Sequence, residues 1–251
     1  LEVGAILGTA EVPFWRTGAK EFTLPRPPSV ALREYVPGNL IYANGHRFVA
    51  RRFHREADEQ RAEVPTFEVC VERQAVKPTA AGAPAGSLGS TMLQTIAVCD
   101  VDLVHVSQIS DDEDLRFQMG VSVYGYERDQ HNGGKAYGWG AQSVHLRRGV
   151  RMRLVNVGAT GAINDKDPVF GYLMCTVCGQ SRSPRSSDRE WENFEKSHLE
   201  RCGRAVTTFG FHADVVADTL SLPACADAKT AYSVLESIRI AATRVLDMHR
   251  E

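Results

Sequence analysis

Three cysteines and one histidine have the residue types and the spacing of a metal site. Cys175 and Cys178 form a C-x2-C pair, and His198 and Cys202 follow as H-x3-C, so the full pattern is C-x2-C-x19-H-x3-C. Thiolate sulfur and imidazole nitrogen are donors that tetrahedral zinc prefers, and four protein donors leave no position for a reactive water. The spacing therefore predicts a structural zinc ion bound by these four residues.

Two local elements must position these donors. Gly179 permits a tight turn that brings the first two thiols to one side of a knuckle. Ser187 and Glu190 match a capping box that begins a helix, and His198 and Cys202 lie one turn apart on that helix. Two other interpretations stay open: cysteines that pack as small hydrophobic residues, and a redox pair without the strand and long helix of a thioredoxin-like site.

Arginines gather in short clusters of the kind that contact nucleic-acid phosphates. If residues 150–157 form a strand, Arg151 and Arg153 point to one face, and an adjoining turn would add two more arginines to a positive ridge. The predicted nucleic-acid-binding residues are Arg147, Arg148, Arg151, Arg153, Arg182, Arg185 and Arg189. A further basic cluster contains Arg51, Arg52, His54 and Arg55. Because basic clusters also occur on ordinary solvated surfaces, DNA binding is a hypothesis at this point.

Most of the remaining chain has the pattern of β-strands. Asn44-Gly45 between two short apolar runs predicts a type I′ hairpin. Antiparallel strands are expected at 115–127, 135–145 and 150–157, with turns at 132–134 and at Arg148-Gly149, followed by a strand near 206–211 and a helix from about 228 to 250. The aromatic residues of these strands either stack on bases or pack on a sheet face, and their alternation favours packing. They are Tyr124, Tyr126, Tyr137 and Trp139.

These elements predict an α+β fold with a mostly antiparallel sheet, a zinc-stabilised strand-loop-helix subdomain and a C-terminal helix. The predicted organisation is a β-rich N-terminal segment at 1–77, a flexible loop at 78–91, an antiparallel β block at 92–164, a zinc-binding subdomain at 165–205, and a strand with the C-terminal helix at 206–251. The Pro-, Ala-, Gly- and Ser-rich composition of 78–91 is the reason for the loop.

Composition narrows the function classes. The 251 residues are 43% hydrophobic, which fills a core, and the net charge of -2 neither favours nor excludes a nucleic-acid partner. No signal peptide and no run of 18 apolar residues occurs, so a cytoplasmic protein without a membrane partner is expected, in which the remaining cysteines are unpaired. Phosphate-loop and nucleophile-elbow motifs are absent, so no catalytic residue is predicted and enzyme activity stays undecided.

Two stretches resemble a group of bacterial superfamily 2 helicases. Residues 31–38 read Ala-Leu-Arg-Glu-Tyr-Val-Pro-Gly and residues 42–48 read Tyr-Ala-Asn-Gly-His-Arg-Phe, similar to the segment that follows the motor core in that group. Residues 231–251 are similar to the helix that begins their C-terminal MrfA-type zinc-binding (MZB) region, as in mitomycin-repair and DISARM phage-defence helicase proteins. Family members carry a further cysteine cluster beyond that helix, so the four ligands named above are assigned from spacing alone.

The resemblance implies a non-catalytic accessory region that helps a helicase to bind DNA during repair or phage defence. The helicase core would lie in the same polypeptide or in a partner, because the chain begins without methionine and ends inside a helical pattern. The alternative is a zinc-dependent scaffold that docks a helicase, methyltransferase or nuclease subunit without contacting DNA. Salt dependence separates the two, since phosphate contacts weaken steeply with added salt.

Overall fold

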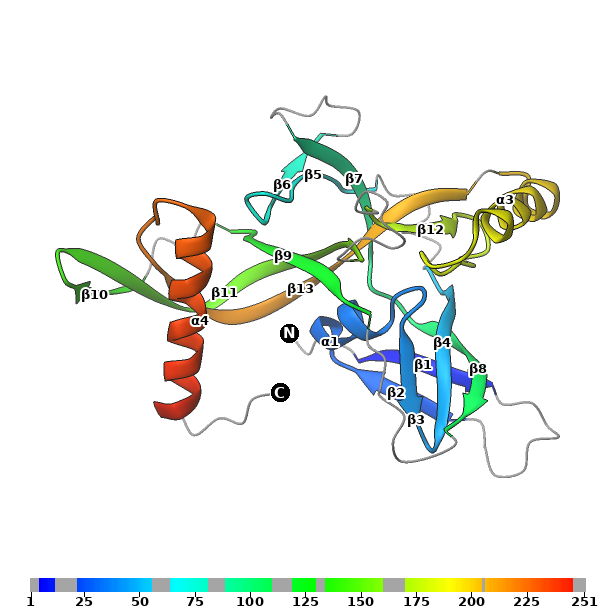
Figure 1. The fold of residues 1–251 in the computed structure, drawn as a ribbon, viewed down its shortest axis with the longest axis horizontal. Helices are drawn as coiled ribbons and strands as arrows, with labels where there is room; N and C mark the ends of the chain where they lie inside the picture. Colours follow the sequence, from blue (N-terminus) through cyan, green and yellow to red (C-terminus); the bar gives the residue numbers. More distant parts are fainter. Residues whose placement is uncertain are drawn as a thin grey trace.

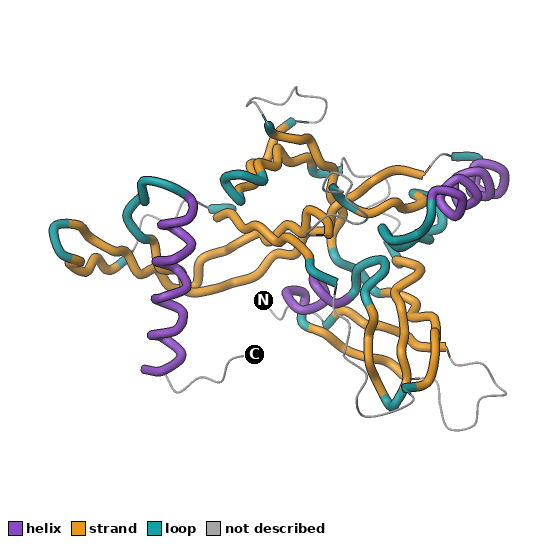
Figure 2. Tube along the Cα trace, in the orientation of Figure 1, coloured by secondary structure: helices purple, strands orange, loops and turns teal. Residues whose placement is uncertain are grey.

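The computed structural model of the protein describes residues 5–11, 22–55, 64–80, 89–109, 119–129, 134–159, 170–204 and 206–245. Within these ranges, two β-sheets and three helices form an α+β fold in which antiparallel pairs dominate, as the sequence predicted (Figure 1). Figure 2 shows how little of this chain is helical: the two longer helices lie at the margins, one short helix lies in the middle, and strands make up most of the rest.

A small sheet has the strand order β2-β1-β8-β4-β3, and its pairs are antiparallel except for β1 with β8. Its strands are β1 (Ile6–Glu11), β2 (Phe22–Arg26), β3 (Leu40–Ala43), β4 (His46–Phe53) and β8 (Val101–Gln108), and α1 (Pro28–Glu34) lies between β2 and β3 in the chain. The expected hairpin is confirmed: Asn44 and Gly45 have φ values of 48° and 76°, as a type I′ turn requires.

A larger sheet has the order β10-β11-β13-β7-β5-β6, with β9 on β11 and β12 on β13. Its strands are β5 (Thr66–Cys70), β6 (Ala75–Thr79), β7 (Ser90–Ala97), β9 (Val121–Glu127), β10 (Lys135–Trp139), β11 (Gln142–Ala159), β12 (Tyr172–Cys175) and β13 (Val206–Ser221). All of its pairs are antiparallel except β13 with β7. The 16 residues of β13 span roughly 50 Å at the usual rise per strand residue and connect the two ends of the molecule.

The two sheets do not follow the predicted order of segments along the chain. β5 and β6 leave the N-terminal segment 1–77 to join the large sheet, and β8 leaves the block 92–164 to join the small one. β6 and β7 extend into 78–91 from both sides, and the middle of the predicted loop, 81–88, lies outside the described residues.

One predicted turn is wrong. Arg148 and Gly149 do not end a strand, because β11 continues through them as a β-bulge whose register shifts between Arg147 and Val150. The turn instead falls at residues 140–141, between β10 and β11, so the expected strand 135–145 is a hairpin. Most of the turn expected at 132–134 lies outside the described residues.

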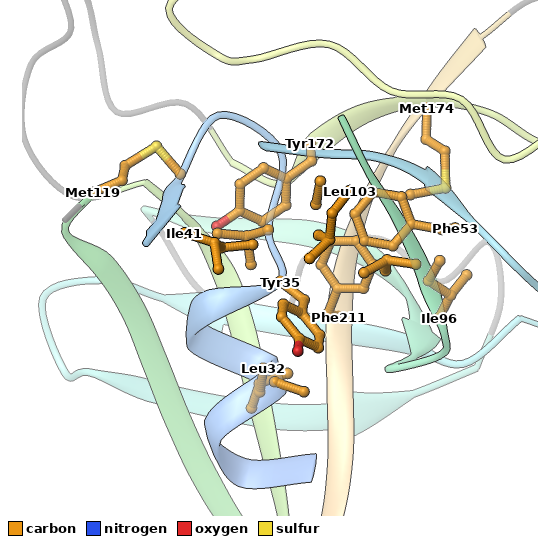
Figure 3. Close-up of a cluster of buried hydrophobic side chains, with 14 of the residues drawn as sticks. Leu32, Tyr35, Ile41, Phe53, Ile96, Leu103, Met119, Tyr172, Met174 and Phe211 are labelled. Carbon is orange, nitrogen blue, oxygen red and sulfur yellow. The ribbon is translucent and has the colours of Figure 1, made fainter. Parts of the chain in front are cut away.

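The main hydrophobic core combines the small sheet, α1 and the neighbouring part of the large sheet (Figure 3). Phe211 of β13 packs between two aromatic rings, with centroids 5.0 Å from Phe53 and 5.5 Å from Tyr172. The buried Asn156 side chain donates to the Leu32 carbonyl at 2.7 Å and accepts the Tyr172 hydroxyl at 3.1 Å. This contact fixes β12, the strand that ends at the first predicted metal ligand.

Two longer helices lie at opposite ends of β13 (Figure 1). α3 (Asp188–Cys202) precedes the strand and α4 (Ala228–Val245) follows it. Among the described residues, neither of these helices nor α1 is long and apolar enough to cross a membrane.

Candidate metal centre

The Cys175 to Gly179 turn forms the predicted knuckle. Cys175 is the last residue of β12, its N–H donates to the Gln180 carbonyl at 2.8 Å, and its carbonyl accepts the Gly179 N–H at 3.0 Å. Gly179 has a φ of 71°, a conformation that a residue with a Cβ adopts only with strain. The backbone therefore reverses within a few residues and presents Cys175 and Cys178 to the same side.

The knuckle is attached to β4 of the small sheet. The Phe53 N–H donates to the Gly179 carbonyl at 2.9 Å, and the Ser181 N–H donates to the Arg51 carbonyl at 2.9 Å. The Arg52 side chain adds a third bond, from its Nε to the Cys178 carbonyl at 3.1 Å. An ideal Cβ on Gly179 would lie only 2.0 Å from the Phe53 carbonyl oxygen, so glycine is required for this close approach.

Helix α3 brings the third cysteine back to the knuckle. Its capping box is confirmed, because Ser187 Oγ accepts the Glu190 N–H and the Glu190 carboxylate accepts the Ser187 N–H. Cys202 is the last helical residue, after which the chain turns at Gly203 and Val206 pairs with Cys175 across β13 and β12. Capping at the start and strand pairing after the end thus place Cys202 beside Cys175.

The three cysteine sulfurs lie within 4.8 Å of one another. At a zinc–sulfur distance of about 2.3 Å, tetrahedral geometry separates the sulfurs by about 3.8 Å, so small side-chain movements suffice for all three to contact one ion. Cys175 is buried, and Cys178 and Cys202 are partly buried. Across the described ranges, no other set of three or more His, Cys, Asp or Glu side chains converges this closely.

His198, the fourth predicted ligand, lies outside this group of sulfurs. Its ring is buried against Phe194, with Nδ1 2.8 Å from the Phe194 carbonyl oxygen and Nε2 3.1 Å from Oε1 of Gln180. Both of these oxygens only accept hydrogen bonds, so a neutral ring donates to only one of them. If Nδ1 keeps the hydrogen for the Phe194 carbonyl, Nε2 has the lone pair that binds metals, and it must then turn away from Oε1 of Gln180.

The thiols differ in acidity. Burial, together with the neighbouring thiols of Cys175 and Cys178, raises the pKa of Cys202 to about 11. Burial also acts to raise the pKa of Cys175, but the backbone N–H groups of Cys178 and Val177 and the two nearby thiols outweigh it and hold that pKa below its ordinary value. A metal ion that binds all three sulfurs must therefore displace protons, so its affinity falls as the pH falls.

The four arginines predicted from β11 divide into paired and unpaired side chains. Arg153 makes two bonds to Asp214, at 2.6 and 2.7 Å, and Arg147 forms an ion pair with Glu127. Arg151 lies 3.8 Å from Asp129, and Arg148 is exposed beside the bulge. Carboxylates thus already neutralise much of the expected positive ridge.

Arginines near the knuckle form a second basic region that includes residues missing from the predicted set. Arg182 follows the knuckle and lies over the Phe194 ring, 5.8 Å from its centroid, while Arg185 and Arg189 are exposed. Arg51 and Arg52 join them because β4 pairs with the knuckle. The sequence shows these two as a basic cluster, but only the contact between distant segments places them here.

The comparisons with known proteins give no relative. No protein-family model matches the chain, and neither the curated proteins nor the solved structures contain a match.

Proposed function

We propose that Cys175, Cys178 and Cys202 bind one zinc ion, with His198 as the fourth donor, and that the centre supports a basic surface that binds DNA. The observation that carries the proposal is the convergence of three thiols within 4.8 Å where β12, β13 and α3 meet. A bound zinc ion would supply a structural cross-link at this junction, because four protein donors leave no open coordination position.

His198 is suited to complete the set. If Nδ1–H donates to the Phe194 carbonyl, the lone pair on Nε2 is the donor that remains. His198 and Cys202 are one helical turn apart on α3, so they lie on the same face, and metal binding requires Nε2 to leave Oε1 of Gln180. Phe194 favours the metal-binding tautomer, and Gln180, whose Oε1 accepts a hydrogen bond from Nε2–H, opposes it.

The DNA-binding part of the proposal rests on charge beside the centre. Arg182, Arg185 and Arg189 follow the knuckle, and Arg51 and Arg52 lie on the strand that the knuckle contacts. Guanidinium groups on a rigid backbone bind phosphate oxygens with little loss of side-chain freedom. This region, with the exposed Arg148 as an addition, is the proposed contact with the DNA backbone.

We place the chain, as part of the same proposal, in an accessory region of a bacterial superfamily 2 helicase or helicase-associated protein used in repair or phage defence. The resemblance of 31–48 and 231–251 to such helicases supports it. In the structure those residues cover the end of α1, β3, the start of β4 and most of α4, and 246–251 lie outside the described residues. No catalytic residue is proposed for this chain.

Metal binding is tested by measuring zinc content and by replacing zinc with Co(II). Three thiolates and one imidazole give intense sulfur-to-cobalt charge-transfer bands and tetrahedral ligand-field bands. His198→Ala should keep the charge-transfer intensity but change the ligand-field bands, whereas Gln180→Ala should leave both unchanged. A protein that binds less than one equivalent of metal, or loses no charge-transfer intensity in Cys202→Ser, refutes the site.

DNA binding is tested with a fluorescent oligonucleotide at several salt concentrations. We expect a steep fall in affinity with salt, and a parallel fall when a chelator removes the metal. Amide hydrogen exchange would show at the same time whether Phe53 and Ser181 lose protection, as their bonds across the knuckle and β4 predict. Unchanged DNA affinity after complete metal removal contradicts the supporting role of the centre.

The exposed face of α4 favours a second candidate, the protein-interaction scaffold. Tyr232, Leu235 and Val245 are 61%, 55% and 82% exposed, and an open hollow of about 420 Å³ lies between Trp139 and the helix. Exposed apolar side chains that gather on one element are typical of contacts with other proteins. If this candidate is correct, Leu235→Glu should abolish partner capture without affecting the binding of free DNA.

A further inference from the structure

Two arginines from distant segments are held side by side next to the knuckle. Arg51 lies on β4, and Arg182 lies in the segment that pairs with β4, where the backbone partners are Arg52 and Gln180. Between them, the Ser181 N–H and Oγ contact the Arg51 carbonyl at 2.9 and 3.4 Å. The pairing of the two backbone segments therefore brings Arg51 and Arg182 close to each other.

The two positive charges act on each other. Arg51 is partly buried, and its pKa is lowered first by that burial and then by the charge of Arg182. Neither Arg51 nor Arg182 forms an ion pair with a carboxylate in the part of the chain that the structure describes. Desolvated charges of one sign are costly unless an opposite charge joins them.

The nearest carboxylate already has another role. Glu190 accepts the N–H and the Oγ–H of Ser187 at 2.8 and 2.9 Å as part of the α3 cap. Glu190 offsets the repulsion between Arg51 and Arg182 only through space. Its hydrogen bonds with Ser187, and to a smaller extent the charges of the two arginines, hold the pKa of its own carboxyl low. One carboxylate thus faces two guanidinium groups.

The wider surroundings do not remove the imbalance. Besides Arg47 at the start of β4, five arginines lie on β4 or between the knuckle and the first turn of α3, namely Arg51, Arg52, Arg182, Arg185 and Arg189. The opposing charges are Asp102, which pairs in register with Arg52, Asp188, Glu190 and the single net negative charge that three thiolates would give to a zinc centre. One positive charge remains in excess.

The Arg182 side chain is also held in place. Its guanidinium lies 5.8 Å from the centroid of the Phe194 ring, which is buried in α3. An arginine that stacks on an aromatic ring loses less conformational freedom when it binds an anion. This separates the pair from the exposed Arg148, for which no such support exists among the described residues.

We propose that the guanidinium groups of Arg51 and Arg182 together bind one phosphate group. Two forked donors from different segments match the oxygens of a phosphate better than a single point charge does. The naming of a DNA phosphodiester as the source rests on the proposed function, and free phosphate is the other source of the same chemistry. The pair is the anchor of the basic region, and its neighbours extend the contact along a strand.

The test uses the zinc-loaded chain and two probes, inorganic phosphate and a fluorescent single-stranded 20-mer. The variants are Arg51→Gln and Arg182→Gln, with Arg73→Gln as the matched control, because Arg73 is exposed in the turn between β5 and β6 and belongs to no proposed contact. NMR of the arginine Nε–H signals reports phosphate binding, and anisotropy at several salt concentrations reports DNA binding. Zinc content and thermal unfolding show whether each variant is folded. If Arg51→Gln does not fold, Arg182→Gln still tests the pair.

We expect phosphate to shift the Nε–H signals of Arg51 and Arg182 and not that of Arg73. Each of the two variants should weaken DNA binding about tenfold and reduce the salt slope by about one, whereas the control should change the affinity less than twofold. Arg182→Lys should recover part of the DNA affinity and little of the phosphate response, since lysine keeps the charge but not the fork.

The outcomes separate this inference from the proposed function. DNA binding that Arg182→Gln and Arg51→Gln reduce no more than Arg73→Gln overturns the phosphate site and leaves the proposed function standing. Phosphate binding at the pair without DNA binding at low salt overturns the proposed function, leaves the phosphate site standing and identifies free phosphate as the ligand. Absence of both kinds of binding overturns both.

Discussion

The substitution Gly179→Ala tests whether the close approach of the knuckle to β4 holds the metal centre in place. In the structure an added Cβ would lie 2.0 Å from the Phe53 carbonyl oxygen, a backbone atom that cannot rotate away. The knuckle must therefore move off β4. That movement breaks the bonds from Phe53 N–H to Gly179 and from Ser181 N–H to Arg51.

The expected loss of stability follows from these contacts. Alanine at a φ of 71° costs about 1 kcal/mol, and each lost backbone hydrogen bond costs about 1 kcal/mol, so the free energy of unfolding should fall by about 3 kcal/mol. Gly45 is the matched control, because its φ is 76° and an added Cβ there meets nothing within 4 Å. Gly45→Ala should therefore cost only about 1 kcal/mol.

Urea unfolding of the two variants measures the difference, and competition with a chromophoric chelator measures metal affinity in the same samples. We expect weaker metal binding in Gly179→Ala and unchanged binding in Gly45→Ala, because only the first substitution moves Cys178. If the two variants lose the same stability and bind metal equally well, the knuckle does not depend on its contact with β4, and the reasoning fails.

Three further predictions concern the elements around the centre. Burial first, and then the charge of Arg153, lower the pKa of His212 to about 4. The free energy of unfolding is therefore highest above about pH 6.5 and falls by up to roughly 3 kcal/mol as the pH drops toward 4, because the unfolded chain binds the proton first. In His212→Gln, this part of the pH dependence of urea unfolding should be absent. Tyr172→Phe removes the bond to buried Asn156 and should lower the free energy of unfolding by about 1 kcal/mol, without changing zinc content. Ser187→Ala removes the α3 cap and should cost about 1 kcal/mol and weaken metal affinity, measured by the same chelator competition.

Local sequence signals predicted one turn and one helix start correctly. The Asn44-Gly45 turn and the Ser187–Glu190 capping box each depend on residues within three positions, so no distant contact can easily override them. The same holds for the knuckle, whose geometry needs little more than two cysteines and the glycine that follows. Three of the four predicted ligands therefore lie close together, as their spacing in the sequence predicted.

Contacts between distant segments account for the parts that the sequence did not predict. Arg148-Gly149 has the composition of a turn, but the long partner strand β13 pairs on both sides of it, and the extra residues form a bulge. Arg147 and Arg153 look like free positive charges until β9 and β13 bring Glu127 and Asp214 beside them. A one-dimensional charge pattern does not contain these partners.

His198 shows why spacing alone does not fix a ligand set. The i, i+4 relation places His198 and Cys202 on one face, but the Phe194 carbonyl is also four residues away and holds Nδ1, while Gln180 competes for Nε2. The direction of the ring is thus decided by two neighbours that any metal-site pattern ignores. The Phe194 carbonyl favours the metal-binding tautomer, and Nε2 is available once it turns away from Oε1 of Gln180, so the histidine stays in the proposed set.

The position of the centre changes what its loss would mean for the whole fold. The four predicted ligands lie within residues 175–202, a pattern that suggests a self-contained subdomain with local effects. The knuckle, however, forms hydrogen bonds with Arg51, Arg52 and Phe53 of the small sheet. Cys175 also pairs with Val206, the first residue of β13. A cross-link at this junction would therefore restrain both sheets and fix the strand that carries Arg51, so we expect metal binding and the shape of the basic surface to be coupled through the same backbone.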